Sequence, residues 1–428
     1  MEPWLQAGKY VAAVMSDLPK RNGWTLAERA GDRTPDRMQR LLNRAVWDAF
    51  AVMGVVRRFA VAGLDEAARK TGRQRGLAVG ALDETGQVKQ GTRTAGVKRQ
   101  YLGCVGKVAN GINTVHLSYV REGTGHALIG AREWVPAEHI DDPVRSLAMS
   151  LPADLVFRTK GQLGIDILAE AFAEGVRLDF VCGDEVYGSC TELRAFLEAH
   201  GQAYVLRVPS SFPVALPGGV TLTCKQAAVR LGSGRDWEIR SAGKGSKGER
   251  WYAWAWLGTA SPRHHLLIRR HLATGELAFH YCYLPPGQQA SLNLLTRAAG
   301  LRWPVEEGFE FGKDCFGLDQ SQVRRYPALA RHTALVMAAL AICTVTAALL
   351  RRRTDTQAPA PAHPDQPPPP DPGMIPLTVP ETMRLLGRPP PPGSTGHWLN
   401  WRRGHQARSR WYHQRTRLAR HTQNAQVT

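Results

Sequence analysis

The spacing of hydrophobic positions changes along the chain, and each change predicts a different kind of element. Up to about residue 75 apolar residues recur three and four apart, as at Met38, Leu41 and Leu42, which predicts helices. Across residues 76–208 short apolar runs alternate with helical stretches, a rhythm that predicts an α/β sheet with a parallel portion. Residues 209–286 alternate apolar and polar positions between glycines and serines, which predicts antiparallel strands before the helices that follow.

Two apolar runs in the predicted sheet each lead into an aspartate. Residues 77–82 form the first run, which we expect to end in a turn at Asp83, and residues 176–183 form the second, followed by Asp184. In α/β sheets functional groups gather at the ends of strands. A single Asp in such a place most often belongs to a turn or caps a helix, so neither aspartate is diagnostic alone.

A third acidic residue lies on a helix that we expect to begin at Pro304, because Pro suits the first turn of a helix. Glu306 and Lys313 lie two turns apart and flank the apolar side of this helix. That side is formed by Val305, Phe309, Gly312 and Phe316. Taken alone, the segment is an ordinary amphipathic helix with a charged face.

Residues 334–350 form an unbroken run of apolar residues and Thr, followed by Arg351, Arg352 and Arg353. The run is at the lower edge of the length that spans a membrane, and it is rich in Ala and Thr. We therefore expect a buried core helix and no membrane partner. A membrane-tethered basic protein is the alternative that this run leaves open.

Charge indicates the kind of partner. The chain has 428 residues, with 55 Lys and Arg against 37 Asp and Glu, and a formal net charge of +18, which favours a polyanion. Its seven cysteines form no C-x-x-C pair, which argues against a disulfide framework or a zinc site. With no signal peptide at the N-terminus, we expect a cytoplasmic protein.

Basic residues gather in three segments that predict DNA contacts. Two short helices around residues 24–31 and 36–44 carry several arginines, and their pattern leaves open a helix-turn-helix reader or an ordinary basic bundle. The loop after the first strand is a predicted phosphate-contacting hairpin with Lys89, Arg93, Lys98 and Arg99. The tail mixes Trp with Arg402, Arg403, Arg408 and Arg410, as nucleic-acid binding requires, although a solvated basic tail fits the same pattern.

Two divalent ions can cut a phosphodiester by activating the attacking oxygen and stabilising the leaving one. Mg²⁺ binds a few carboxylates and keeps positions open for water and phosphate. Asp83, Asp184 and Glu306 would supply such a set.

In this combination the sequence resembles the bacterial insertion-sequence transposases of the DDE class. The catalytic helix of that family carries Tyr, Arg, Glu and Lys at fixed spacing; Arg302, Glu306 and Lys313 match it, and Ala299 stands at the Tyr position. Residues 82–86 resemble the family's first-Asp strand, and residues 182–188 resemble its second.

The resemblance implies a ribonuclease-H-like mixed sheet with flanking helices, an antiparallel β insertion before the catalytic Glu helix, and an N-terminal helical domain. We accordingly expect an N-terminal DNA-binding domain (1–75), a catalytic core in two parts (76–208 and 287–353), the β-rich insertion (209–286), a Pro-rich linker (354–396) and a DNA-binding tail (397–428).

By the same resemblance Asp83, Asp184 and Glu306 bind two Mg²⁺ or Mn²⁺ ions, while Arg302 and Lys313 contact DNA phosphates near the cut. The implied reaction is water attack that frees a 3′-OH at the end of the element, followed by attack of that 3′-OH on target DNA. The implied partners are double-stranded element ends and target, bound by a homodimer. Two alternatives stay open: a transposase-derived DNA-binding protein that does not cut, and a metal-dependent nuclease that does not join strands.

Overall fold

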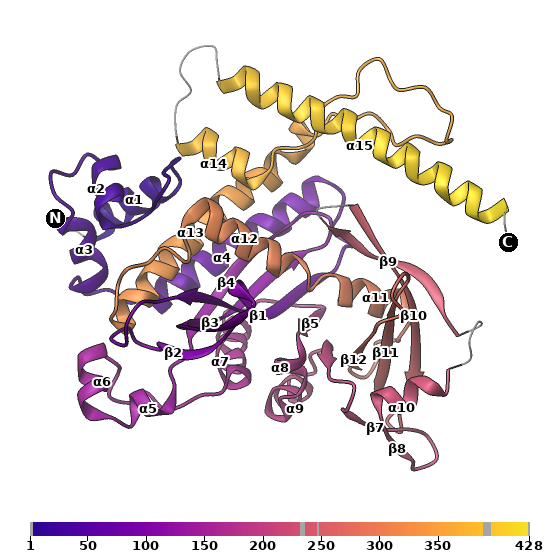
Figure 1. Cartoon of the computed structure of the whole chain (residues 1–428), viewed down its shortest axis with the longest axis horizontal. Coiled ribbons are helices and arrows are strands. Elements are labelled where there is room, and N and C mark those ends of the chain that lie inside the picture. Colours follow the sequence, from indigo (N-terminus) through magenta and orange to yellow (C-terminus); the bar gives the residue numbers. More distant parts are fainter. Residues whose placement is uncertain (1–2, 232–235, 246–247, 388–394, 427–428) are drawn as a thin grey trace.

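The computed structural model describes residues 3–231, 236–245, 248–387 and 395–426. The first 75 residues are helical, as the apolar spacing predicted: α1 (Pro3–Val14), α2 (Gly23–Arg29), α3 (Asp36–Asn43) and α4 (Ala49–Lys70) (Figure 1). Helix α2 begins at Asn22, whose side chain accepts from the backbone of Trp24 and Thr25. Just after α2, Gly31 takes a left-handed φ of 72°.

One sheet of ten strands organises the described residues. Its order is β2-β3-β1-β5-β6-β12-β11-β10-β9, and β4 pairs with β3 outside this path. The bounds are β1 (Ala78–Val88), β2 (Lys98–Leu102), β3 (Lys107–Arg121), β4 (Gly125–Glu133), β5 (Phe180–Gly183), β6 (Tyr204–Val208), β9 (Glu238–Gly245), β10 (Gly248–Gly258), β11 (His264–His271) and β12 (Leu277–Tyr283). Strands β1, β5 and β6 are parallel, as the strand-helix rhythm predicted.

Strand β1 does not end in a turn at Asp83, as we had expected, but continues to Val88. The reason is its antiparallel partner β3, which pairs with it along its whole length, from Ala78 opposite Arg121 to Val88 opposite Gly111. On its other side β1 loses its partner early, because β5 stops at Gly183 beside Leu82. Beyond Leu82 that edge of β1 is therefore open.

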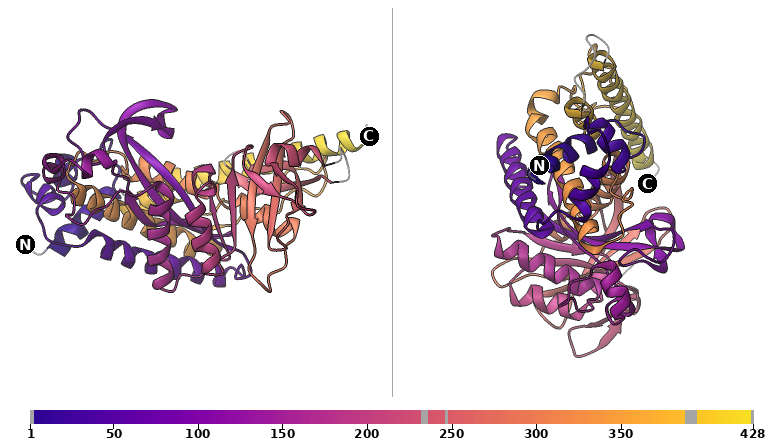
Figure 2. Two further views of the ribbon diagram at one scale, coloured as in Figure 1. Left: turned by 90° about the horizontal axis from the view of Figure 1, so that it is seen from below. Right: turned by 90° about the vertical axis from the view of Figure 1, so that its left-hand side faces the viewer.

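The predicted antiparallel strands of residues 209–286 are present, but they do not form a separate unit. Strand β12 pairs antiparallel with β6, so β9 to β12 extend the same sheet. A small hairpin of β7 (Pro213–Ala215) and β8 (Thr221–Thr223), with α10 (Cys224–Val229), belongs to this segment. Figure 2 shows β9–β12 at one end of the long axis and the N-terminal helices at the other.

Helices cover both faces of the sheet. One face carries α7 (Lys160–Ala173), α8 (Glu185–Gly188) and α9 (Thr191–Ala199), and the other carries α11 (Leu292–Gly300), α12 (Pro304–Phe316) and α13 (Tyr326–Thr354) (Figure 1). The short helices α5 (Ala137–Ile140) and α6 (Pro143–Met149) follow β4. Helix α4, from the predicted N-terminal domain, packs against α13 and β4 and so is part of this core.

Helix α13 contains the apolar run 334–350. Among the described residues it is the one helix long and apolar enough to cross a membrane, yet 72% of its apolar window is buried within the protein. It packs against α4, β4 and α1. The interpretation of this run as a buried core helix is therefore confirmed.

The predicted linker 354–396 is only partly extended. Residues 355–378 contain neither helix nor strand, but α14 (Val379–Gly387) packs on α13 and buries Met383. Residues 388–394 lie outside the described residues. The basic tail then forms one long helix, α15 (Thr395–Gln426), which runs across the molecule above α13 and α14 (Figure 1).

Candidate active site

Asp83 and Asp184 lie side by side on neighbouring parallel strands. The register places Leu82 opposite Gly183, so Asp83, the next residue of β1, lies beside Asp184, the first residue after β5. Asp184 is also the N-cap of α8, and its side chain accepts from the Val186 amide at 2.9 Å. Carboxylate oxygens of Asp83, Glu84 and Asp184 all lie within 4.8 Å of one another.

Glu306 joins this group through Arg302. The Arg302 guanidinium donates to Asp83 Oδ2 at 2.7 Å and also to Glu306 Oε1. Helix α12 positions Glu306 because it begins just after Arg302 and packs against β1. The structure thus places Glu306 next to the pair of aspartates, linked to Asp83 by the Arg302 cation, although its carboxylate is not in the close group of Asp83, Glu84 and Asp184.

The electrostatics of the site favour the arrival of a proton or a cation. Burial raises the pKa of Asp83 to about 7; the nearby charges of Asp184 and Glu84 push in the same direction, and Arg302 opposes them. Burial, and then Glu84, also raise the pKa of Asp184. The group offers only carboxylate oxygens, which are the ligands that Mg²⁺ and Mn²⁺ prefer, so the residues present fit such ions.

Glu84 was missed in the sequence. Alternation along a strand places it on the opposite face from Asp83, where Lys160 Nζ lies 2.5 Å away and Tyr187 donates to it at 3.1 Å. Its carboxylate nevertheless approaches Asp184, because β5 has already ended there. The only sequence signal was an acid next to Asp83, and that signal does not reveal where the neighbouring strand stops.

Glu307, the neighbour of Glu306, does not contact Arg302 but pairs with a histidine. Its carboxylate lies 3.1 Å from His126 Nε2 on β4. Lys313 lies two turns further along α12, beside His116 and Thr85, at the edge of a small cavity of about 20 Å³. It is therefore not a member of the carboxylate cluster.

The other predicted DNA-binding residues divide into exposed and engaged groups. Lys98 pairs with Glu138 at 2.6 Å, whereas Arg99 is exposed on β2. In the same predicted hairpin Lys89 is buried and donates to the Ser321 carbonyl at 2.5 Å. That hairpin is thus only partly available to a phosphate.

On α15, Arg402 and Arg408 are exposed. Arg410 donates to Gln357 at 2.9 Å. Arg403 is buried and donates to the carbonyls of Ile375 and Thr354, so it anchors the helix to the chain beneath it. Its donors are used inside the protein in this conformation, so DNA contact by Arg403 stays a prediction.

Comparison with known proteins gives three findings. The sequence model of a family described as DDE superfamily endonuclease matches residues 4–255. The chain is 32% identical over 107 residues to the probable transposase for insertion sequence element IS701 of Microchaete diplosiphon, and this match covers 25% of each protein. It is similar to piggyBac transposase in a synaptic complex with hairpin DNA, at 12% identity and a TM-score of 0.41, over 90% of this chain and 70% of that one. The family match includes Asp83 and Asp184 and stops before Glu306.

Proposed function

Since the chain belongs to the DDE superfamily endonucleases, as the resemblance in its sequence predicted, we propose that it is a transposase that cuts and joins DNA. One observation carries the proposal: Asp83 and Asp184 lie side by side at the open edge of β1, with Glu306 linked to Asp83 by Arg302. That geometry gathers three acids from separate parts of the chain, as two-metal phosphodiester chemistry requires.

The strand order supports a ribonuclease-H-like core. Strands β4, β3 and β1 are antiparallel neighbours, and β1, β5 and β6 follow in parallel. The acids lie on the central strand β1, just beyond the end of β5, and on the helix α12 that covers them. In this proposal residues 209–286 are an extension of that core sheet.

We propose Asp83, Asp184 and Glu306 as the ligands of two Mg²⁺ or Mn²⁺ ions, with Glu84 close enough to contribute. When bound, the ions would activate the attacking oxygen and stabilise the leaving oxygen. Arg302 now neutralises Asp83 and Glu306, and it would be released toward a DNA phosphate once other cations take these carboxylates. Lys313 and the exposed Arg99, Arg402 and Arg408 would contact the DNA backbone.

The proposed reaction has two displacements at phosphorus. A water oxygen attacks the phosphate at the end of the element, the bond from phosphorus to O3′ breaks, and a 3′-OH is released. That 3′-OH then attacks a phosphate of the target, forming one new phosphodiester while the target strand's own O3′ leaves. Each step makes one bond and breaks one, so joining needs no external energy source.

The test is cleavage and joining of DNA that carries the element's own ends, with Mg²⁺ or Mn²⁺ and with Glu306→Ala as the control. A protein that binds end DNA but neither nicks nor joins it would show a DNA-binding protein without activity. Cleavage without joining of pre-cut ends would show a nuclease. Light scattering of the protein with paired ends tests the proposed homodimer.

A further inference from the structure

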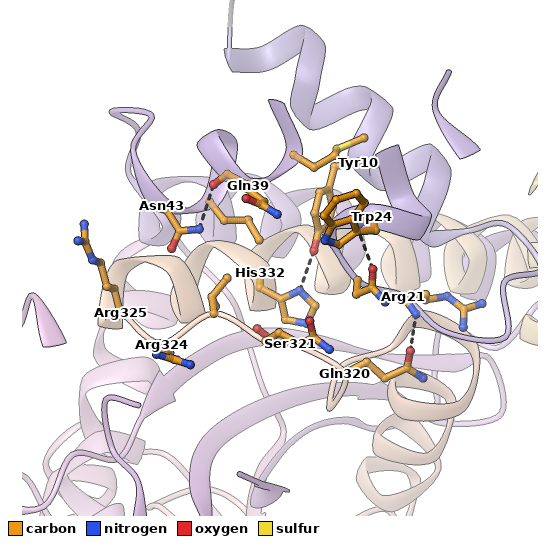
Figure 3. A pocket seen from close by; sticks show the side chains of 16 residues that line it. Tyr10, Arg21, Trp24, Gln39, Asn43, Gln320, Ser321, Arg324, Arg325 and His332 are labelled. Carbon is orange, nitrogen blue, oxygen red and sulfur yellow. Dashed lines mark hydrogen bonds between the residues drawn. The ribbon is translucent and has the colours of Figure 1, made fainter. Parts of the chain in front are cut away.

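A pocket of about 430 Å³ lies between the N-terminal helices and the segment that follows the catalytic helix (Figure 3). Its volume is in the range of sites that hold a small ligand or a single building block of a polymer. It shares Ser321 and His332 with the small cavity beside Lys313, so it is close to α12. None of the catalytic carboxylates lines it.

One wall of the pocket presents amide groups from α3. Gln39 and Asn43 lie one turn apart on the same face (Figure 3). Asn43 Nδ2 donates to the Gln39 backbone carbonyl at 3.0 Å, which leaves its Oδ1 free to accept. Among the described residues, the Gln39 side-chain amide has no hydrogen-bond partner.

Residues 320–325 form the opposite wall, and their backbone is held at the Ser321 carbonyl by Gln87 and Lys89. The Ala95 amide also donates to the Arg324 carbonyl at 2.8 Å, and the Arg21 amide holds the Gln320 side chain through Oε1 at 2.6 Å. The side chains of Arg324 and Arg325 are exposed and have no intramolecular partner within the described part of the chain. This wall therefore offers positive charge on a fixed backbone.

The floor is closed and the rim is aromatic. Tyr10 Oη lies 2.9 Å from His332 Nδ1, and His332 Nε2 lies 3.2 Å from the Gly317 carbonyl, so these two buried side chains of the floor are already paired. Trp24 lines the pocket and is 66% exposed. A ligand would consequently meet amides, guanidinium groups and an indole face.

This set matches one class of ligand. Asn and Gln amides recognise adenine through its N6 and N7 atoms, exposed Trp rings stack on unpaired bases, and Arg binds phosphate. We propose that the pocket binds an unpaired adenine nucleotide of a DNA strand, with Gln39 and Asn43 reading the base and Arg324 and Arg325 holding its phosphates. The inference rests on the proposed function only in taking DNA as the partner.

The base is expected to be unpaired because the pocket is walled by protein on two sides. A duplex presents its base edges inside a groove between two backbones. The surface of α3 that lines the pocket faces residues 320–325, so it is not free to enter such a groove. A free adenine nucleotide would satisfy the same groups, so the experiment has to separate the two sources.

The test measures binding of the full-length protein, in EDTA, to fluorescent oligodeoxyadenylate and oligothymidylate single strands. We expect about tenfold tighter binding of the adenine strand. The double variant Gln39→Ala/Asn43→Ala should lose that preference while its affinity for oligothymidylate stays the same. Arg324→Gln/Arg325→Gln should weaken both and reduce the salt dependence. Gln289→Ala, an exposed amide outside the pocket, is the matched control.

Equal affinity of the wild type for the two strands, or a preference retained by the double variant, would overturn the inference. Competition by dAMP at the same concentration as the strand would assign the pocket to free nucleotides and overturn its DNA role. Because the assay contains no metal, it is independent of catalysis. A protein that cuts and joins DNA without an adenine preference would refute adenine binding by the pocket and leave the proposed function intact.

Discussion

Arg302 acts, in this structure, as the cation of the carboxylate site, since it contacts both Asp83 and Glu306. Replacing it with Ala leaves two partly buried acids without their counter-charge, which should cost about 1–3 kcal/mol of stability. Saturating Mn²⁺ should restore most of the loss, because the ion then supplies the missing charge. Thermal unfolding of Arg302→Ala with and without Mn²⁺ measures both effects. If Mn²⁺ leaves the loss of stability unchanged, Arg302 and the metal do not compete for the same carboxylates. Arg402→Ala is the control.

Glu306 and Glu307 form a matched pair for testing the register of α12. Glu306→Ala should lower the rate of strand cleavage by at least about 100-fold. Loss of a group that only supports a metal ligand costs up to about 100-fold, and Glu306 is itself a proposed ligand. Glu307→Ala should stay close to the wild type, because Glu307 pairs with His126 instead. Cleavage rates of the two variants on the same DNA decide this, and the reverse ranking would mean that α12 is misassigned.

Glu133 provides a pH dependence outside the proposed metal site. Burial raises its pKa to about 8, while the Thr114 hydroxyl and Lys89 oppose this shift. An acid whose pKa is raised on folding stabilises the protein below its unfolded pKa, and that contribution is lost as pH rises through the folded value. We therefore expect stability to fall between about pH 4.5 and 8, by up to about 1.4 kcal/mol per unit.

Glu133→Gln should remove that slope, so its melting temperature should exceed that of the wild type at pH 8 and not at pH 5. Unfolding curves of both proteins across this range provide the measurement. Burial lowers the pKa of Lys89 to about 8, so its own effect lies above this window and has the opposite sign. Parallel curves for the two proteins would show that Glu133 titrates normally.

At the scale of elements, α11 packs closely against β9 at Gly300. A Cβ at residue 300 would collide with the Ala242 carbonyl, and Arg250 also donates to the Gly300 carbonyl at 2.9 Å. Gly300→Ala should push α11 away from β9, cost about 1–3 kcal/mol and displace Arg302, two residues further on. Gly8→Ala on α1, where no heavy atom is near, should instead stabilise by about 0.5–1 kcal/mol. Urea unfolding compares the two; equal effects would exclude the close contact as the cause.

Elements with local signals could be predicted from the sequence. Helix α12 begins at Pro304 and ends before Gly317, which takes a left-handed φ of 68°, and both residues mark helix ends by their own chemistry. Strand β5 could be located by its apolar run, but it occupies only Phe180–Gly183 of the predicted 176–183. The length of β1 could not, because it depends on pairing with β3, and the apolar pattern of β1 fades at Asp83.

In the site, too, some features could be predicted from local sequence signals and others could not. Asp83, Asp184 and Glu306 could be selected because an Asp directly after each apolar run and a Glu at helical spacing are visible in the chain, although β1 in fact continues beyond Asp83. The role of Glu84 and the bridge from Arg302 to Asp83 could not, since both depend on how separate elements come together. The burial of Arg403 could not be predicted either, because the sequence of a basic helix does not distinguish a buried arginine from an exposed one.

For the whole molecule, the tail is more closely integrated than its composition indicated. Helix α15 buries Trp411 and Arg403, and Arg417 lies against Gly248 at the start of β10. The proline-rich residues beneath it contribute carbonyl acceptors, as Gln366 does for Arg415. Proline-rich composition predicts an extended backbone, but it does not predict whether another element covers that backbone.

The pairing of β6 with β12 has a consequence for engineering the protein. A variant without residues 209–286 would turn β6 into an edge strand, with the unpaired amides and carbonyls of Tyr204–Val208 open to solvent. Such an edge is a template for pairing between molecules, so we expect the shortened protein to aggregate rather than fold as a smaller enzyme. Size-exclusion chromatography would show this, with truncation before Thr395, which removes no strand, as the control. A soluble monomer from the first deletion would mean that the half of the sheet with the proposed site closes its own edge.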